Sequence, residues 1–235
     1  MSTWRDFFNG EHSIYVNDRH RTLHDQRVAR DVASLVRELS RGPRPVVLDY
    51  GCGEATEAPV VAAAAETLLL SDAAPAIRER LRARFATDPR IQVLSPEEVA
   101  AQPHGSVDIV VVNSLLQYLT HTEFTGLCDT AFDLLRPGGW IVLGDVIPPD
   151  VSPVTDASAL LRFGWEGGFL LASLGGLVRT ALSDYRKLRQ ELGLTTYGEE
   201  DMIALLQACG FEAHRRIPNI GHNQARMTFL ARKPA

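Results

Sequence analysis

Residues 46–55 read VVLDYGCGEA, an apolar run that predicts a buried strand and then a turn with two glycines. Gly51 and Gly53 leave room for a ligand against the backbone, because a side chain there would block it. Asp49 precedes the turn, and a carboxylate there suits a cationic, amine-bearing ligand better than a pyrophosphate. The G-x-G-x-x-G pattern of dinucleotide-binding proteins is incomplete, since Thr56 stands in place of its third glycine.

From Pro45 onward, short apolar runs alternate with longer amphipathic stretches, a pattern typical of strands joined by crossover helices around a parallel sheet. Helices are predicted from Pro75 to Asp88-Pro89, over residues 122–135 up to the Arg-Pro-Gly-Gly turn, and over 199–208. The last two strands are close in sequence, which predicts an antiparallel pair. The predicted strands are residues 46–50, 67–71, 90–94, 107–112, 140–146, 211–217 and 226–232.

The composition is that of a globular protein: 45% of the 235 residues are hydrophobic, 23% are charged, and the net charge is -5. The slightly acidic balance argues against a nucleic-acid partner. Cys52, Cys128 and Cys209 show neither a disulfide framework nor zinc spacing. Residues 1–10 lack a signal-peptide pattern, and no run reaches the roughly 18 apolar residues of a spanning helix. We therefore expect a cytoplasmic protein with no transmembrane segment.

Four motifs, in order, resemble those of class I S-adenosylmethionine-dependent methyltransferases. They are the acidic residue and glycine turn at 49–53, the second strand ending at Asp72, the fourth strand ending at Asn113, and the L-R-P-G-G turn into the fifth strand. The resemblance covers roughly Arg44 to Val146, and the two closing strands match by order alone. It implies an α/β, doubly wound, mostly parallel seven-stranded sheet with a Rossmann-like methyltransferase fold.

The resemblance also implies that S-adenosyl-L-methionine is the cofactor. The Asp72 carboxylate would hold the two ribose hydroxyls, and Ala73 would lie against the adenine. Ser95 stands where many relatives carry an acidic residue for the adenine amine, so a hydroxyl, a backbone group or Glu97 is expected there instead. Tyr15 or Arg19 would close the amino-acid end. The complete predicted cofactor set is Tyr15, Arg19, Asp49, Gly51, Cys52, Gly53, Asp72, Ala73, Ser95, Pro96 and Asn113.

Methyl transfer to a hydroxyl or a protonated amine requires a base, and histidine is the commonest choice. His20, His24 and His222 are the predicted bases, with His121 as a further candidate. An ordinary surface or capping role is the alternative for each of them. His20 and His24 are four residues apart, yet no third ligand stands beside them, so we predict no metal site. The predicted acceptor-binding residues are Gln117, Tyr118 and Asn223; Tyr118 as a core residue is the alternative.

We predict one domain over 1–235, with a helical arm (1–44), a cofactor-binding core (45–146), a lid insertion (147–198) and a closing helix and strands (199–235). Residues 156–192 are predicted to be helical and are apolar, with five glycines. This composition favours a lid over a lipophilic or aromatic small-molecule acceptor. A homodimer surface, a peripheral membrane patch and a helix pair packed on the sheet are the alternatives.

The leading functional prediction is thus a small-molecule methyltransferase. One alternative is a dinucleotide-dependent oxidoreductase, which the missing third glycine disfavours. The other is a non-catalytic module that binds the cofactor.

Overall fold

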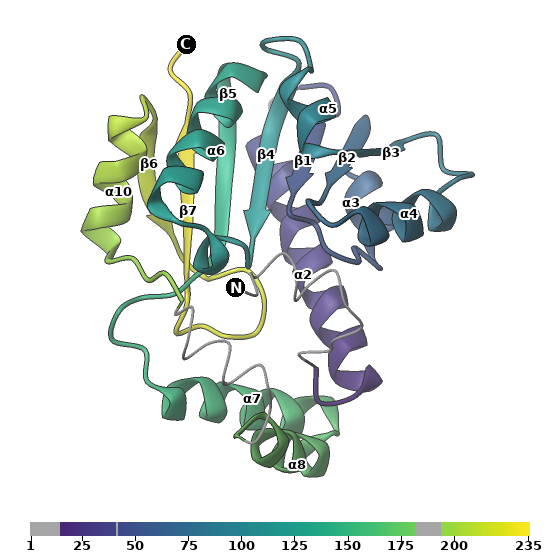
Figure 1. The fold of residues 1–235 in the computed structure, drawn as a ribbon, viewed down its shortest axis with the longest axis vertical. Helices are drawn as coiled ribbons and strands as arrows, with labels where there is room; N and C mark the ends of the chain where they lie inside the picture. Colours follow the sequence, from purple (N-terminus) through teal and green to yellow (C-terminus); the bar gives the residue numbers. More distant parts are fainter. Residues whose placement is uncertain (1–14, 41, 182–193) are drawn as a thin grey trace.

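The computed structural model describes residues 15–40, 42–181 and 194–235, and these contain a seven-stranded sheet in the order β3-β2-β1-β4-β5-β7-β6 (Figure 1). Strands β1 to β5 run parallel, whereas β7 is antiparallel to both β5 and β6. The strands are β1 (Val46–Tyr50), β2 (Thr67–Ser71), β3 (Ile91–Leu94), β4 (Val107–Asn113), β5 (Leu135–Val146), β6 (Glu212–Arg216) and β7 (Met227–Arg232). This is the predicted Rossmann-like methyltransferase fold, including the antiparallel pair at its end.

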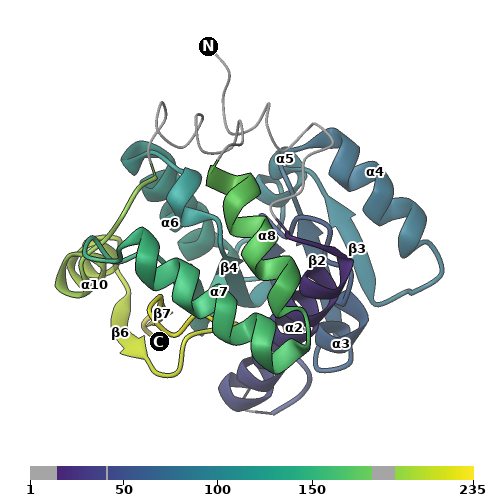
Figure 2. The same cartoon turned by 90° about the horizontal axis from the view of Figure 1, so that it is seen from below.

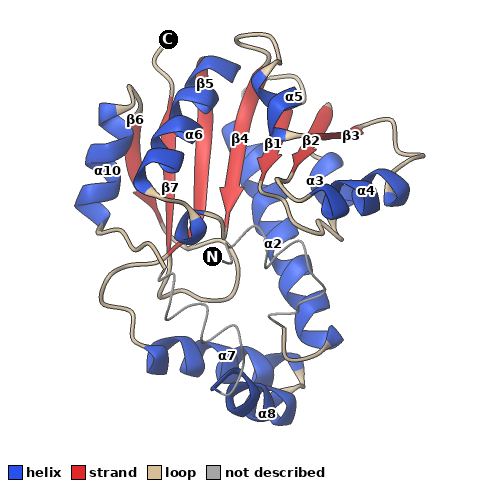
Figure 3. Ribbon diagram, in the orientation of Figure 1, coloured by secondary structure: helices blue, strands red, loops and turns tan. Residues whose placement is uncertain are grey.

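Helices cover both faces of the sheet, which explains why β4 is apolar and buried along almost its whole length. Apolar residues of α2, α3 and α4 form one core with the sheet, and those of α5, α6 and α10 form the other. Figure 3 shows the resulting layers. The helices are α2 (Asp18–Leu39), α3 (Ala58–Ala62), α4 (Pro75–Arg84), α5 (Pro96–Ala100), the 3-10 turn η1 (Leu116–Tyr118), α6 (His121–Leu134), α7 (Pro153–Gly167), α8 (Leu170–Ala181) and α10 (Glu199–Ala208).

The arm helix α2 begins where the Asn17 side chain accepts a hydrogen bond from the His20 backbone N–H at 2.8 Å. Its buried stripe packs against the sheet over its second half. Its first half extends beyond the carboxyl edge of the sheet and contacts α7 (Figure 1). Seen from below, α7 and α8 lie across this edge (Figure 2). None of the described helices has the length and apolar character needed to cross a membrane.

The predicted start of the fifth strand was wrong. Strand β5 begins at Leu135, not at Trp140, because Leu135 already pairs with Val107 of β4. The two glycines that follow bond to the backbone of Lys233. Gly138 N–H donates to the Lys233 carbonyl, and the Gly139 carbonyl accepts from the Lys233 N–H. The predicted turn is therefore part of an irregular strand.

The described part of the predicted helical segment 156–192 forms two helices, α7 and α8. Gly168 ends α7 with φ 71°, a left-handed conformation that glycine adopts without a steric penalty, and α8 then starts at Leu170. Residues 1–14 of the predicted arm and 182–193 of the predicted lid lie outside the described residues.

Candidate active site

The glycine turn after β1 is fixed to the end of β2. The backbone N–H groups of Gly51 and Cys52 both donate to the Ser71 carbonyl, at 2.7 and 3.0 Å. Gly51 and Gly53 have φ values of 75° and 56°, which a residue with a Cβ rarely adopts. A Cβ on Gly53 would meet no atom within 4 Å, so open space lies beside this backbone. The turn thus leaves room for a ligand at the carboxyl edge of the sheet.

Asp72 is held beside the turn by two backbone donors. Its Oδ2 accepts from Gly53 N at 3.1 Å and its Oδ1 from Ala74 N at 2.8 Å. Each carboxylate oxygen can accept more than one hydrogen bond, so both keep capacity for a ligand hydroxyl. Burial raises the pKa of Asp72 despite these bonds.

Asp49 lies at the end of the adjacent strand β1. Burial, and then the charge of Asp72, raise the pKa of Asp49 to about 7. Two carboxylates in this position repel each other when both are ionised, and a ligand that brings a positive charge and hydroxyl donors would relieve that repulsion.

The other predicted cofactor residues differ in their surroundings. Cys52 is half-buried, and burial raises the pKa of its thiol well above the usual range. Ala73 is exposed after β2. Ser95 caps α5, accepting from Glu98 N at 3.2 Å, and Pro96 is the first residue of that helix. The Ser95 hydroxyl therefore has a structural role in addition to the predicted contact with adenine.

Asn113 ends β4, and its Nδ2 donates to Ser114 Oγ at 3.1 Å. Its Oδ1 is buried without a hydrogen-bond partner in the described structure. The same oxygen lies so close to Gly144 of β5 that a Cβ there would collide with it. The Asn113 amide thus lies against Gly144, its paired residue on β5.

Tyr15 and Arg19 bond to groups of the arm and of α7. The Tyr15 hydroxyl donates to Asp25 Oδ1 at 3.4 Å, and burial and Asp25 raise its pKa. Arg19 Nε donates to the Gly167 carbonyl at 2.5 Å, which ties the arm to the end of α7. The arm reaches the turn through Asp25, whose Oδ2 accepts from Thr56 Oγ1 at 2.6 Å.

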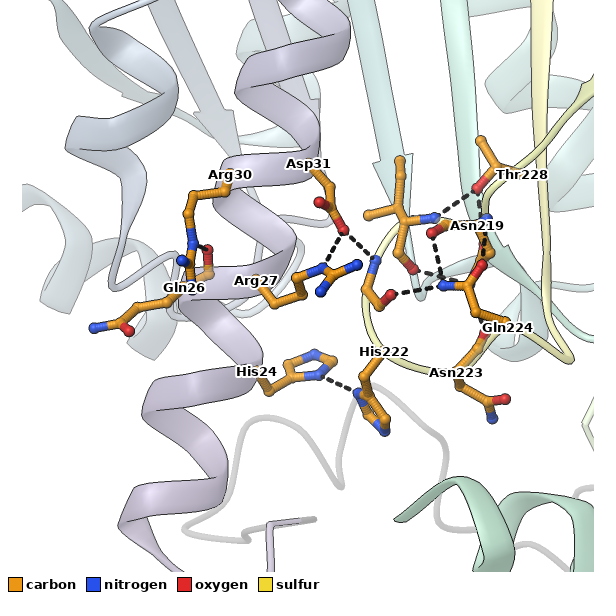
Figure 4. Close-up of polar contacts among 12 residues, drawn as sticks. His24, Gln26, Arg27, Arg30, Asp31, Asn219, His222, Asn223, Gln224 and Thr228 are labelled. Atoms are coloured by element: carbon orange, nitrogen blue, oxygen red, sulfur yellow. Dashed lines mark hydrogen bonds and ion pairs between the residues drawn. The ribbon is translucent and has the colours of Figure 1, made fainter. Parts of the chain in front are cut away.

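The three predicted bases meet. His20 and His24 come from α2, and His222 comes from the loop between β6 and β7, 198 residues from His24. The ring centroids are 6.3 Å apart for His20 and His24, 6.1 Å for His20 and His222, and 5.5 Å for His24 and His222. The Nδ1 atoms of His24 and His222 lie 3.4 Å apart (Figure 4). We call His20, His24 and His222 the histidine cluster.

Two phenylalanines of the lid complete the histidine cluster on its other side. Phe163 of α7 stacks on His222 with centroids 4.2 Å apart, and Phe169, between α7 and α8, stacks on His20 at 5.3 Å. Tyr15 lies against His20 and His24 at 5.3 and 5.6 Å. Arm, lid and loop thus converge on one aromatic surface.

Burial keeps the imidazoles neutral at neutral pH. It lowers the pKa of His20 and of His24 to about 4, with the neighbouring His24 as the second cause for His20. Burial and the other two imidazoles lower the pKa of His222 to about 3. Neutral imidazoles are able to accept protons.

Asn219 organises the loop that carries His222 (Figure 4). This buried amide accepts from Asp145 N at 3.2 Å and from Thr228 Oγ1 at 2.7 Å. It donates to the carbonyls of Ile220 and Asn223 at 2.8 and 2.9 Å. All the hydrogen-bonding groups of the Asn219 amide are satisfied, and the loop is held in one conformation.

The remaining predicted residues differ in their surroundings. Gln117 is buried, and its Nε2 donates to the Ser114 carbonyl at 2.8 Å; Tyr118 follows it in η1. Asn223 donates to Asp156 of α7 at 3.0 Å and so joins loop to lid. His121 is exposed at the first residue of α6, which is consistent with the alternative surface role. No group of metal-ligating side chains was found in the described part of the chain.

Sequence reasoning missed four groups beside the site. Phe163 and Phe169 were noted only as part of an apolar lid. Asp25 and Asp145 were not singled out, although Asp145 is an acidic residue at the end of a predicted strand, the same signal that identified Asp72.

A shallow cavity of about 250 Å³ lies at the opposite end of β4 and β5, between Asp108, Arg136 and Trp140. It is separate from the glycine turn and takes no part in the site.

The sequence matches the profile of the family described as "Methyltransferase domain" over residues 23–215, most of the chain. The chain belongs to this methyltransferase family. Its cofactor is S-adenosyl-L-methionine, and the class I assignment made from the four motifs is confirmed. No curated protein matches the sequence significantly.

Solved structures share the fold of this methyltransferase. Magnesium protoporphyrin IX methyltransferase (ChlM) from Synechocystis, with bound S-adenosylhomocysteine, is 20% identical with a TM-score of 0.58, covering 98% of this chain and 92% of that one. The N-methyltransferase NodS from Bradyrhizobium japonicum is 20% identical with a TM-score of 0.57, covering 93% and 94%. SibL is 16% identical with a TM-score of 0.59; this chain spans only 55% of its length.

The residues of this methyltransferase fit the cofactor. The Asp49 carboxylate would suit an amino group, the Asp72 carboxylate would suit ribose hydroxyls, and the open space beside Gly53 would admit a ligand against the backbone. The donor set therefore matches a molecule that is cationic and carries a ribose.

Proposed function

We propose that this methyltransferase transfers a methyl group to a small apolar or aromatic molecule, with the histidine cluster supplying the base. The observation that carries the proposal is the meeting of three neutral imidazoles with Phe163 and Phe169. A hydrogen bond from Thr56 to Asp25, the residue after His24, supports the proposal because it joins α2 to the segment that follows the glycine turn. An aromatic, partly buried surface favours an acceptor of the same character.

S-adenosylmethionine supplies an electrophilic methyl group on a sulfonium. The protein has to hold the acceptor in line with it and remove a proton where the acceptor is a hydroxyl.

The hydrogen bonds favour the pair of His24 and His222 as the base. His20 Nδ1 accepts from Val16 N at 3.3 Å, so neutral His20 carries its proton on Nε2 and acts there as a donor. In the contact between His24 and His222, one Nδ1 donates to the other. The donating ring then has a bare Nε2, which is the atom that would accept the proton.

The test is S-adenosylhomocysteine release with a panel of acceptors, from hydroxylated aromatics and fatty acids to sugars and polar amino acids. We expect transfer to the apolar and aromatic members only. His222→Gln should lower kcat at least about 100-fold while the affinity for S-adenosylhomocysteine stays unchanged, since general-base catalysis contributes roughly that much. The exposed His104 offers the matched control, His104→Gln, with wild-type activity. Transfer to polar acceptors alone would overturn the proposal.

The lid also presents an exposed apolar surface, on which the predicted homodimer and the predicted peripheral membrane contact both rest. Trp165 is 75% exposed, Leu171 84% and Leu174 47%. Sedimentation and vesicle flotation separate the two, because self-association needs no lipid. Trp165→Ser combined with Leu171→Ser should abolish whichever of the two occurs. We also propose that the protein is cytoplasmic.

A further inference from the structure

Two non-glycine residues with left-handed backbone lie side by side at the carboxyl edge. Ser114, directly after β4, has φ 55°, and Asp145, near the end of β5, has φ 59°. The pairing of β5 with β7 shifts register between Leu143 and Val146, on either side of Asp145. Such irregularities re-aim side chains next to active sites, and left-handed non-glycine residues gather there too.

A chain of hydrogen bonds fixes the Asp145 carboxylate. Asn113 donates to Ser114 Oγ, which donates to Asp145 Oδ2 at 2.8 Å. Within the described structure no donor bonds to Asp145 Oδ1. The carboxylate is half-buried, and burial raises its pKa whereas Arg226 and Ser114 lower it. One oxygen is therefore held in place while the other keeps its hydrogen-bonding capacity.

The strand order places Asp145 on the opposite side of Asp49 from Asp72. The carboxyl ends of β2, β1, β4 and β5 follow one another along the edge and carry Asp72, Asp49, Ser114 and Asp145. Strands lie about 4.8 Å apart, so Asp145 is two strands, roughly 10 Å, beyond Asp49. Asp145 also raises the pKa of Tyr15, which packs on His20 and His24. Asn219, which holds the loop of His222, also accepts from the Asp145 backbone N–H, so Asp145 lies beside the loop of the histidine cluster.

We propose that Asp145 recognises the acceptor by taking a hydrogen bond from one of its hydroxyl or N–H groups, so that the favoured acceptors are hydroxylated or amino-substituted aromatics. This inference rests on the proposed function and narrows its substrate class. Asn219 and Ser114 position the carboxylate, Asn219 by binding the Asp145 backbone N–H. A bond from a donor to a carboxylate is among the stronger hydrogen bonds, so it discriminates between acceptors of equal shape.

The test uses the full-length protein saturated with S-adenosylhomocysteine and two probes of nearly equal apolar surface, naphthol and methoxynaphthalene. Only naphthol has a hydrogen-bond donor. Calorimetry should show naphthol binding about tenfold more tightly to the wild type. Asp145→Ala should remove this preference, and Asp145→Asn should reduce it, because an amide oxygen accepts a weaker bond than a carboxylate.

Asn suits the left-handed conformation of Asp145, so Asp145→Asn should fold even where Asp145→Ala does not. Asp150→Asn, on the exposed loop after β5, is the matched control and should keep the tenfold preference. Equal binding of the two probes by the wild type, or an unchanged preference in Asp145→Asn and Asp145→Ala, would overturn the role of Asp145 and leave the proposed function standing. Binding of neither probe, with no methyl transfer to aromatics, would overturn the proposed function as well.

Discussion

Gly51 and Gly53 share a left-handed backbone, but their surroundings predict different defects. A Cβ on Gly51 would lie 2.6 Å from Leu115 Cδ2, whereas one on Gly53 would meet only open space. Each alanine costs about 1 kcal/mol in backbone strain. We expect Gly51→Ala to lower the Tm further, because Leu115 must also move. Gly53→Ala should weaken S-adenosylhomocysteine binding at least about tenfold with a smaller change in Tm.

Thermal unfolding and calorimetry on both variants check this pair. Wild-type affinity in Gly53→Ala would mean that the ligand does not use the space beside that residue.

Asp72 is the residue on which the ribose contact depends. Asp72→Ala removes the acceptor for Gly53 N and Ala74 N as well as the ligand contact. We expect S-adenosylmethionine affinity to fall by about 100-fold, as befits the loss of two charge-assisted bonds to the ligand. Asp88 accepts from the Arg90 backbone in a distant turn, so Asp88→Ala is the control. Normal binding by Asp72→Ala in calorimetry would refute the ribose assignment.

At the scale of elements, one ion pair holds the lid to the sheet. Arg226 donates two bonds from Nη2 to Asp156 of α7, at 2.8 and 2.9 Å, and its side chain is only 11% exposed. Asp156→Asn leaves the Arg226 cation without its carboxylate partner. We expect the free energy of unfolding to fall by about 2 kcal/mol, which is less than for a fully buried pair. Hydrogen exchange in α7 should speed up accordingly.

The same helix supplies the control for that measurement. Glu166 pairs with Arg162 on the exposed surface, where removing a charge costs well under 1 kcal/mol, so Glu166→Gln should leave the exchange of α7 unchanged. Equal exchange in both variants would show that the ion pair does not hold the lid.

For the whole molecule, the histidine cluster predicts acid sensitivity. The folded-state pKa of His222 is about 3, below its ordinary 6.5, so the unfolded chain binds more protons as pH falls below 6.5. Its contribution to stability is fully present above pH 6.5 and is lost as pH falls toward 3. The loss in the free energy of unfolding is about 2 kcal/mol at pH 5. The raised pKa of Asp49 acts in the opposite direction over this range.

Comparison of variants isolates the histidine contribution. The drop in Tm from pH 7 to pH 5 should be smaller in His222→Gln than in the wild type, while the exposed His104→Gln should follow the wild type. Identical pH profiles for all three proteins would contradict a buried, neutral His222.

Local patterns in the sequence determined the succession of strands and helices along the chain, the glycine turn after the first strand, and the position of Asp72 at the end of the second strand. Each of these features depends on residues near one another in the chain. The histidines were found as residue types, but their meeting was decided by the tertiary structure. His222 reaches His24 across 198 positions only because the antiparallel β6 and β7 return the loop to the carboxyl edge, where Asn219 fixes it. Asp145 was not found from the sequence. Its proposed role depends on a register shift between β5 and β7, and no pattern within β5 alone encodes that pairing.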